Sequence, residues 1–325
     1  MTAAALQESL TRLYPIPAEH RVADTDHAAA AQLLNCSPRT LDQLVHNGLP
    51  STDGRFDSRD LYNLGLHSGA GTTGPEQAFG YTLRWLRAPT GTLIAPRSST
   101  FELGARCGVP GGCAGSPYSV VARPLAKLYD GDVGDLELTG SMLVVESTVV
   151  SAQSEVAIAT TLETRGRLAP LRAPALHAVM RDFLDAGLRW VKLPTALQSD
   201  RDLLAQHGIA TCASAGLHLA DACERAGYPA ATRIGWVIGM LDLVHAWVEV
   251  VDDDGETKVL DPIFALFAAA VPDANPMLRD PTVSLRTNRL IPTGLRVGES
   301  VAGHACGWLP KPVRVSTKIL PRRAR

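Results

Sequence analysis

The sequence predicts an α+β fold in which one helix packs across an antiparallel sheet. Between residues 212 and 226, apolar side chains recur at steps of three and four residues, which is typical of a helix with one buried face. Three runs rich in β-branched and aromatic residues follow at 231–238, 244–250 and 257–261. A turn at 252–255 joins the last two runs, so they are expected to pair as a hairpin.

Composition places the chain among globular proteins. Its 325 residues are 46% hydrophobic and 20% charged, which predicts a sizeable core. The net charge of −2 provides no overall field that would attract nucleic acid or an anionic membrane. The sequence shows neither a run of 18 apolar residues nor the pattern of a secretory signal. We therefore expect a cytoplasmic protein with reduced cysteines, no cofactor and no metal.

The first predicted unit, residues 1–70, is a small helical module. Ser37 can cap a helix that has Pro38 at its first position and Gly48 just beyond its end. A further helix is predicted to start near Ser58. The order and spacing of these helices resemble the helix-turn-helix of the excisionase and MerR-type families, which implies a DNA-reading helix.

The charge of this module disfavours DNA as its partner. Residues 19–66 carry a net charge of −3, whereas phosphate neutralisation supplies most non-specific affinity for DNA. Arg39 is the only basic side chain on the presumed recognition helix, residues 38–47, and Asp42 lies on the same side, where it would repel phosphates or bind Arg39. We expect the module to pack on the rest of the chain or to recruit a protein or peptide carrier, through apolar side chains such as Leu41, Leu44 and Val45.

The second predicted unit, residues 71–172, is β-rich. The strand-like runs YTLRWL, GTLIAP, SMLVVESTVV and EVAIATTLET are separated by clusters of glycine, proline and serine. Cys107 and Cys113 bracket a glycine-rich stretch, but five intervening residues and the lack of a nearby histidine fit zinc binding poorly. We expect a loop that holds two thiols by chance.

The third predicted unit, residues 173–325, contains the candidate chemistry. Helical periodicity precedes it in PALHAVMRDFLDAGLRWV and LQSDRDLLAQHG. Cys212 begins the next helix, where free backbone N–H groups and the helix dipole favour a thiolate, the reactive form of cysteine. Hairpin pairing would bring Asp261 beside His245, so that the carboxylate fixes one tautomer of the ring while the other nitrogen faces the thiol. Residues 311–325 are basic and are expected to form a solvated terminus.

Four fragments in this unit follow one another in a recognisable order. They are Cys212 at a helix start, Gly227-Tyr228-Pro229-Ala230 with Arg233, His245-Ala246-Trp247-Val248-Glu249, and Asp261-Pro262. Over roughly residues 174–265 the chain therefore resembles the transglutaminase-like superfamily of papain-like thiol enzymes. One departure is that Arg233 follows Ala230 by three residues instead of about two, which suggests a shifted or bulged first strand. The resemblance implies Cys212 as nucleophile, His245 as base and Asp261 as orienter.

Three further residues lie in or near this predicted site. Gln206 precedes Cys212 by six residues, the offset at which papain-like enzymes carry an oxyanion glutamine, and the backbone N–H of Cys212 is the alternative donor. Trp247 would pack beside His245 and limit water access, or would line a substrate pocket. Cys223 falls on the buried face of the helix and is expected to be a core residue.

The resemblance implies attack of the thiolate on an amide or thioester carbonyl to form an acyl-enzyme. Resolution by water would make the protein a peptidase or amidase, and resolution by an amine would make it an amide-forming transferase. The expected partner is a peptide, amide or carrier-bound acyl substrate, with an amine acceptor in the second case. No membrane partner is expected, and the sequence predicts no oligomeric state. The alternative is a non-enzymatic regulator that binds DNA or protein through the N-terminal module, with an inert transglutaminase-like scaffold.

Overall fold

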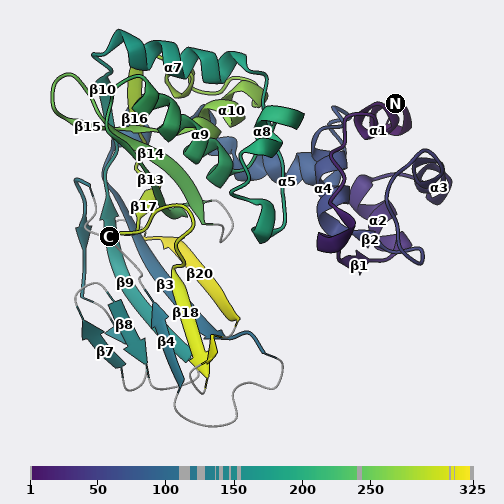
Figure 1. Cartoon of the computed structure of the whole chain (residues 1–325), viewed down its shortest axis with the longest axis horizontal. Helices are drawn as coiled ribbons and strands as arrows, with labels where there is room; N and C mark the ends of the chain where they lie inside the picture. The colour runs from purple at the N-terminus through teal and green to yellow at the C-terminus, as the bar shows by residue number, and fades with distance from the viewer. Residues whose placement is uncertain are drawn as a thin grey trace.

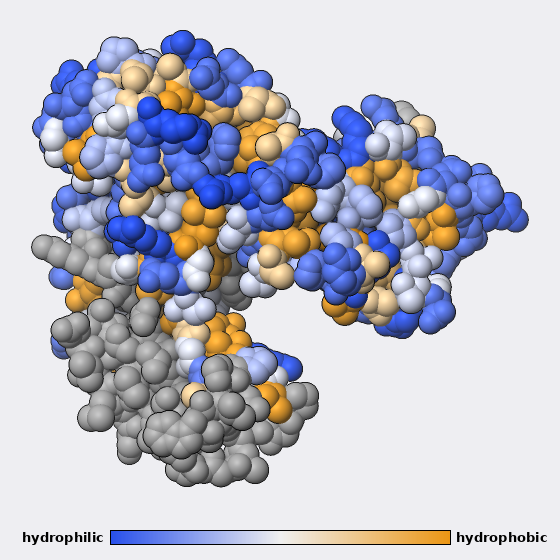
Figure 2. Space-filling view, in the orientation of Figure 1, coloured by the Kyte–Doolittle hydropathy of each residue, from blue (hydrophilic) through white to orange (hydrophobic). Residues whose placement is uncertain are grey.

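A computed structural model of the chain describes residues 2–109, 118–122, 129–135, 137–138, 142–145, 148–151, 155–239, 244–306, 309–310 and 312–322. The described residues form a mixed α+β structure. The N-terminal helices lie to one side, and a layer of helices on a central sheet stands above two further sheets (Figure 1). The space-filling view shows the N-terminal helices projecting away from the rest of the molecule (Figure 2). No helix in the described part of the chain is both long and apolar enough to cross a membrane.

The N-terminal module is a cluster of short helices around its own apolar core. Ser37 caps the third helix by accepting a hydrogen bond from the Thr40 N–H at 3.1 Å, and Gly48 has a positive φ of 107° just after its end, which confirms the predicted bounds. Leu41 and Leu44 are buried in this core instead of forming a docking surface, because they face the neighbouring helices of the module. The elements are α1 (Thr2–Leu10), η1 (Ala18–His20), β1 (Ala23–Thr25), α2 (His27–Leu34), α3 (Pro38–His46), β2 (Phe56–Asp57) and α4 (Ser58–Leu66).

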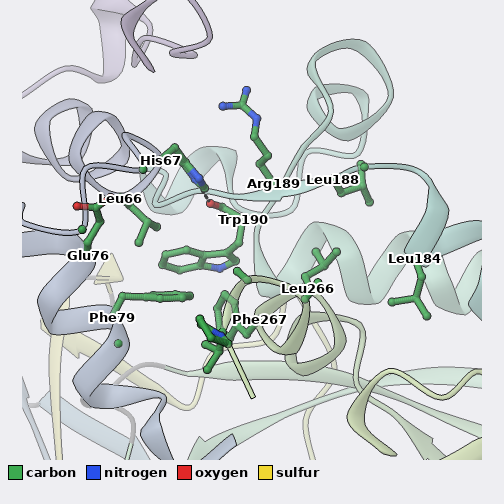
Figure 3. Close-up of a pocket in the computed structure, with 18 of the residues that line it drawn as sticks. Leu66, His67, Glu76, Phe79, Leu184, Leu188, Arg189, Trp190, Leu266 and Phe267 are labelled. Atoms are coloured by element: carbon green, nitrogen blue, oxygen red, sulfur yellow. Dashed lines mark hydrogen bonds between the residues drawn. The ribbon is translucent and has the colours of Figure 1, made fainter. Parts of the chain in front are cut away.

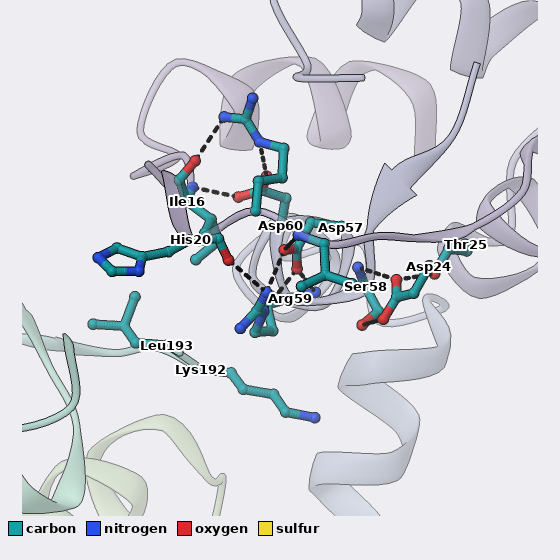
Figure 4. Close-up of polar contacts among 12 residues, drawn as sticks. Ile16, His20, Asp24, Thr25, Asp57, Ser58, Arg59, Asp60, Lys192 and Leu193 are labelled. Carbon is teal, nitrogen blue, oxygen red and sulfur yellow. Dashed lines mark hydrogen bonds and ion pairs between the residues drawn. The ribbon is translucent and has the colours of Figure 1, made fainter. Parts of the chain in front are cut away.

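Arginine side chains of the module bind the module itself (Figure 4). Arg59 donates to the buried Asp57 carboxylate at 2.5 Å, and Arg21 donates to the Ile16 carbonyl at 2.6 Å. Arg55 donates to two backbone carbonyls of β1. These three cations therefore hold the module together.

Arg39 and Asp42 do not form a pair. Arg39 is exposed on α3, whereas the Asp42 carboxylate contacts His27 Nε2 at 2.9 Å. Asp42 therefore does not bind Arg39, and it pairs instead with His27 and so links α2 to α3.

The segment after the module is helical, so the prediction of strands at YTLRWL and GTLIAP was wrong. It contains α5 (Gly74–Thr82), η2 (Arg84–Arg87) and α6 (Thr90–Ile94). Thr73 and Glu76 form a reciprocal capping box that starts α5. Leu83 and Leu86 then become buried in the main core, and this packing outweighs the β propensity of the aromatic residues.

The central sheet carries α9 (Cys212–Arg225) across one face. Its strands are β13 (Ala230–Val237), β14 (His245–Val251), β15 (Thr257–Leu260) and β17 (Leu290–Pro292), in the antiparallel order β15-β14-β13-β17. The three strands expected from the sequence are confirmed, and β17 was not predicted. The register from Ala230↔Val250 to Gly235↔His245 is continuous, so Arg233 causes no shift or bulge.

Helices and short strands complete this central layer. The predicted helices α7 (Pro174–Asp185) and α8 (Asp202–His207) are present, and α7 and α10 (Pro262–Ala270) pack against α9. The remaining elements are β10 (Arg167–Pro170) paired with β16 (Val283–Arg286), β11 (Arg189–Trp190) paired in parallel with β12 (Ile209–Ala210), η3 (Thr195–Leu197) and η4 (Pro276–Leu278).

The expectation of a solvated C-terminus was wrong, because residues 313–321 form a strand. This strand, β20 (Val313–Pro321), pairs along its whole length with β3 (Arg97–Cys107). On one face of the strand Val313 and Ile319 pack against the second core and Thr317 is buried between them, whereas Val315 is exposed. The basic residues obscured this period-2 pattern. The β-rich segment is therefore completed by strands that follow the central sheet in sequence.

Two sheets make up this β-rich part. One has the order β20-β3-β9-β5, where β9 spans Glu155–Thr164 and β5 spans Asp132–Val133. The short strand β6 (Glu137–Leu138) also pairs with β9. The other has the order β19-β18-β4-β8-β7, formed by β4 (Tyr118–Ala122), β7 (Met142–Val145), β8 (Thr148–Ser151), β18 (Ala302–Cys306) and β19 (Leu309–Pro310). Phe101 of β3 and Trp236 of β13 meet in a second core, which also contains Ile234 of β13 and Ala246 of β14. Cys107 ends β3, and Cys113 lies outside the described residues.

Candidate active site

Cys212 is the first residue of α9, and a reciprocal cap fixes that position. The Thr211 hydroxyl accepts a hydrogen bond from the Ser214 N–H at 3.1 Å, and the Ser214 hydroxyl accepts one from the Thr211 N–H at 2.9 Å. Cys212 is half-buried and packs against both of these apolar cores. The cap satisfies the Ser214 N–H, whereas the N–H of Cys212 itself, at the first helical position, has no acceptor within the helix.

His245 and Asp261 meet where β14 begins and β15 ends. His245 Nε2 lies 2.7 Å from Asp261 Oδ2, and the other carboxylate oxygen of Asp261 accepts a hydrogen bond from the Phe264 N–H at 2.9 Å. Asp261 is thus the N-cap of α10, with Pro262 in its first turn. The Asp261 carboxylate therefore caps α10 and orients the imidazole ring of His245 at the same time. This double role explains why Asp261 is followed by Pro262, a residue suited to the first turn of a helix.

The His245 ring is held in an apolar slot. Its side chain is 1% exposed, and it stacks on Phe264 with ring centroids 4.8 Å apart and an interplanar angle of 10°. Its Nδ1 atom is buried and makes no hydrogen bond of ordinary geometry, but the Cys212 side chain lies near enough to interact with the ring. Burial by itself would lower the pKa of His245, but the charge of Asp261 and then that of Cys212 outweigh it, so the pKa of His245 is raised. The imidazolium is therefore favoured at neutral pH beside the Cys212 thiol.

The other two sequence candidates, Gln206 and Trp247, differ in their relation to this group. Gln206 is exposed on α8, and its side chain makes no hydrogen bond within the described residues. Trp247 packs beside His245 with ring centroids 6.0 Å apart, as expected, but it is fully buried and so cannot form the wall of an open substrate pocket. Cys223 is buried, as predicted, and burial raises the pKa of its thiol to about 12.

The sequence did not predict the hydrogen-bonded chain that holds the Trp247 indole through Tyr129, Glu249 and Arg233. The indole N–H of Trp247 donates to the Tyr129 hydroxyl at 2.7 Å, and that hydroxyl donates to Glu249 at 2.6 Å. Arg233 binds the same carboxylate at 2.7 Å. Burial and then the charge of Glu249 raise the pKa of Tyr129, which keeps the phenol protonated as a donor. Opposite charges on adjacent strands at 233 and 249 were the available signal, whereas nothing near Tyr129 indicated its partner.

A cavity of about 790 Å³ lies apart from these residues, between the end of the N-terminal module and the far half of α10. Trp190, Phe79 and Phe267 form its aromatic wall, and His67 Nε2 donates to the Trp190 carbonyl oxygen at 2.7 Å (Figure 3). None of Cys212, His245 and Asp261 lines it.

Comparisons with known proteins give one similarity, to a solved structure. No protein-family model and no curated protein matches the chain. The structure is similar to the crystal structure of a "putative cysteine protease" from Cytophaga hutchinsonii, with 11% sequence identity and a TM-score of 0.44. The similarity covers 71% of this chain and 93% of that chain. A similarity of this degree establishes neither the fold nor the activity of the present chain.

Proposed function

We propose that the protein is a cysteine-dependent acyl-transfer enzyme of the transglutaminase-like kind, with Cys212 as nucleophile, His245 as acid and base, and Asp261 as orienter. The observation that carries the proposal is the fully buried His245. One of its ring nitrogens is bound to Asp261 at 2.7 Å, and the charge of Asp261 and then that of Cys212 raise the pKa of the ring.

The proposed reaction has two halves. The Cys212 thiolate attacks the carbonyl carbon of an amide or thioester, a C–S bond forms, and His245 gives its proton to the leaving amine or thiol as the old bond breaks. Water or an amine, deprotonated by His245, then attacks the thioester and releases Cys212. The first outcome is hydrolysis by a peptidase or amidase, and the second is amide formation.

Two features of the helix start support this chemistry. The positive end of the α9 dipole favours the Cys212 thiolate, and the backbone N–H of Cys212 is a suitable donor to the oxyanion of the tetrahedral intermediate. The buried rings of Phe264 and Trp247 exclude water from the His245–Asp261 hydrogen bond, which strengthens it.

Alkylation of individual thiols tests the nucleophile. Iodoacetamide labelling of the native protein at neutral pH, followed by peptide mass spectrometry, is expected to modify Cys212 at least tenfold faster than Cys36. Cys36 is the matched internal control, because it is equally half-buried but burial raises the pKa of its thiol. His245→Gln should remove the difference. Labelling of Cys212 at the rate of Cys36 in the wild type would rule out an activated thiol.

Trapping the acyl-enzyme tests the reaction class. Acid quenching of the wild type after incubation with a cell extract is expected to leave a mass adduct on Cys212 that hydroxylamine removes, as expected of a thioester. Cys212→Ala should carry no adduct. Loss of the adduct accelerated by added glycinamide would favour the transferase, and loss insensitive to amines would favour the hydrolase.

A further inference from the structure

Three arginines and a tryptophan gather beside the candidate active site. The Arg289 guanidinium lies over the Trp85 ring, 4.7 Å from its centroid, and Arg289 Nη1 donates to the Ile238 carbonyl at 2.7 Å. Burial and then the charges of Arg97 and Arg84 lower the pKa of Arg289 to about 10, so the three guanidinium groups act on one another. We call Arg84, Trp85, Arg97 and Arg289 the arginine cluster.

The arginine cluster lacks a negative partner. Within the described parts of the chain, no carboxylate forms an ion pair with any of its three arginines. The Nε atoms of Arg97 and Arg289 and the indole nitrogen of Trp85 are buried without a hydrogen bond. Buried donors and like charges left unpaired cost free energy, and a bound anion would supply the missing acceptor oxygens.

The backbone leaves space for this arrangement. Gly239 has a φ of 85°, and a Cβ built on it would lie 2.8 Å from Arg289 Nη1. The positive φ favours glycine at this position, and a Cβ there would displace the guanidinium end of Arg289.

The cluster is connected to the candidate active site through two ring contacts. Trp85 meets Phe264 edge to face with centroids 5.0 Å apart, and Phe264 stacks on His245. Ile238, which binds Arg289, follows the end of β13, whose Gly235 lies opposite His245. A substrate whose carbonyl carbon reaches Cys212 could thus extend a second group toward the arginines.

We propose that the arginine cluster is a binding subsite for an oxyanion, a carboxylate or a phosphate, on the acyl donor at a distance from the reacting carbonyl. Arginine pairs with the two oxygens of such groups in a fixed planar geometry, which gives both affinity and orientation. Only the statement that the anion belongs to the acyl donor rests on the proposed function. Binding energy from this remote group would help to hold the carbonyl at Cys212.

Calorimetric titration of the full-length Cys212→Ala protein with inorganic phosphate and, separately, with succinate tests the subsite at constant ionic strength. We expect saturable binding of at least one anion, weakened at least tenfold by Arg289→Gln and by Arg97→Gln. Stronger binding of phosphate would identify a phosphorylated donor, and stronger binding of succinate would identify a carboxylate donor. Arg39→Gln, which removes an exposed arginine on α3, is the matched control and should bind as the parent does.

The stability of the variants provides a second readout. Because Arg289 is a half-buried cation without a negative partner among the described residues, Arg289→Gln is expected to leave the Tm of the anion-free protein unchanged or raised, and to abolish the rise in Tm that the anion causes. If Arg289→Gln fails to fold, Arg97→Gln decides the matter. Absence of binding by the parent protein, or equal binding by Arg97→Gln and Arg39→Gln, would overturn the subsite. Since no step uses the thiol, fast Cys212 alkylation without anion binding would leave the proposed function standing.

Discussion

Replacing the buried Asp60 with asparagine should remove a pH-dependent component of the stability of the N-terminal module. The Asp60 side chain is 0% exposed, and its Oδ1 accepts the Ile16 N–H at 2.8 Å, whereas Oδ2 lies 3.6 Å from Arg21 Nε without a hydrogen bond (Figure 4). Burial raises the pKa of Asp60 from 3.8 to about 6, against the smaller opposing effect of the Ile16 N–H. Asparagine keeps the acceptor oxygen but cannot titrate.

The sign and size of the effect follow from proton linkage. Between pH 4 and 6 the folded module binds more protons than the unfolded chain, so this contribution to stability is complete below pH 4 and is lost as the pH rises through 6. For a folded pKa of about 6, the opening free energy of the wild type relative to Asp60→Asn should fall by about 1.3 kcal/mol between pH 5 and pH 7. This corresponds to roughly a tenfold change in the ratio of their protection factors.

Hydrogen exchange followed by mass spectrometry on peptides from α1 and α4 measures this ratio, after correction for the intrinsic exchange rate at each pH. Asp57→Asn is the matched control, because hydrogen bonds from Arg59 and the backbone outweigh the effect of burial and lower the pKa of Asp57. Its contribution titrates below pH 4, so its ratio to the wild type should be flat between pH 5 and 7. A flat ratio for Asp60→Asn would refute the argument and would mean that Arg21 keeps Asp60 ionised in the fold.

Three more predictions concern the central sheet. Tyr129→Phe should lower the free energy of unfolding by about 1–3 kcal/mol, because it leaves the buried Trp247 indole N–H without an acceptor, whereas Glu249 keeps Arg233; a change below about 0.5 kcal/mol in urea unfolding would contradict this. Asp261→Asn should preserve the cap of α10 but lower the pKa of His245, since it removes a negative charge that favours the imidazolium. The alkaline limb of the pH profile for Cys212 alkylation should then move to lower pH, and an unmoved limb would show that Asp261 does not set the ring's charge. Gly235→Ala should prevent native folding, because its Cβ would lie 2.0 Å from the Ile291 carbonyl oxygen; a native near-ultraviolet circular dichroism spectrum would disprove the clash.

The candidate site could be predicted where local signals and hairpin geometry sufficed. The apolar periodicity of residues 212–226 and a hairpin between 244 and 261 predict where three side chains lie, and the structure has the helix start and the His245–Asp261 contact where they were expected. The pairing of β13 with β17 was not predicted, because β17 is a three-residue strand that carries no periodicity.

Contacts between distant segments account for the remaining failures. Tyr129 reaches Trp247 across 118 residues, and no local pattern reports such a contact. Residues 81–86 read as a strand from their aromatic and β-branched content, but a capping box upstream and burial against the main core make them helical. Residues 313–321 read as a solvated tail because their charges dominated a period-2 pattern that only becomes visible beside β3.

The pairing of β20 with β3 has a consequence for how the chain is made. Lys318 and Glu102 face each other across this ladder although 216 residues separate them. During synthesis β3 therefore leaves the ribosome long before its second neighbour exists, with β9 on one side and an open row of N–H and C=O groups on the other. The β-rich part can close only after the whole central layer has been translated, so nascent chains stopped before residue 313 should need chaperones that cover an unpaired strand edge.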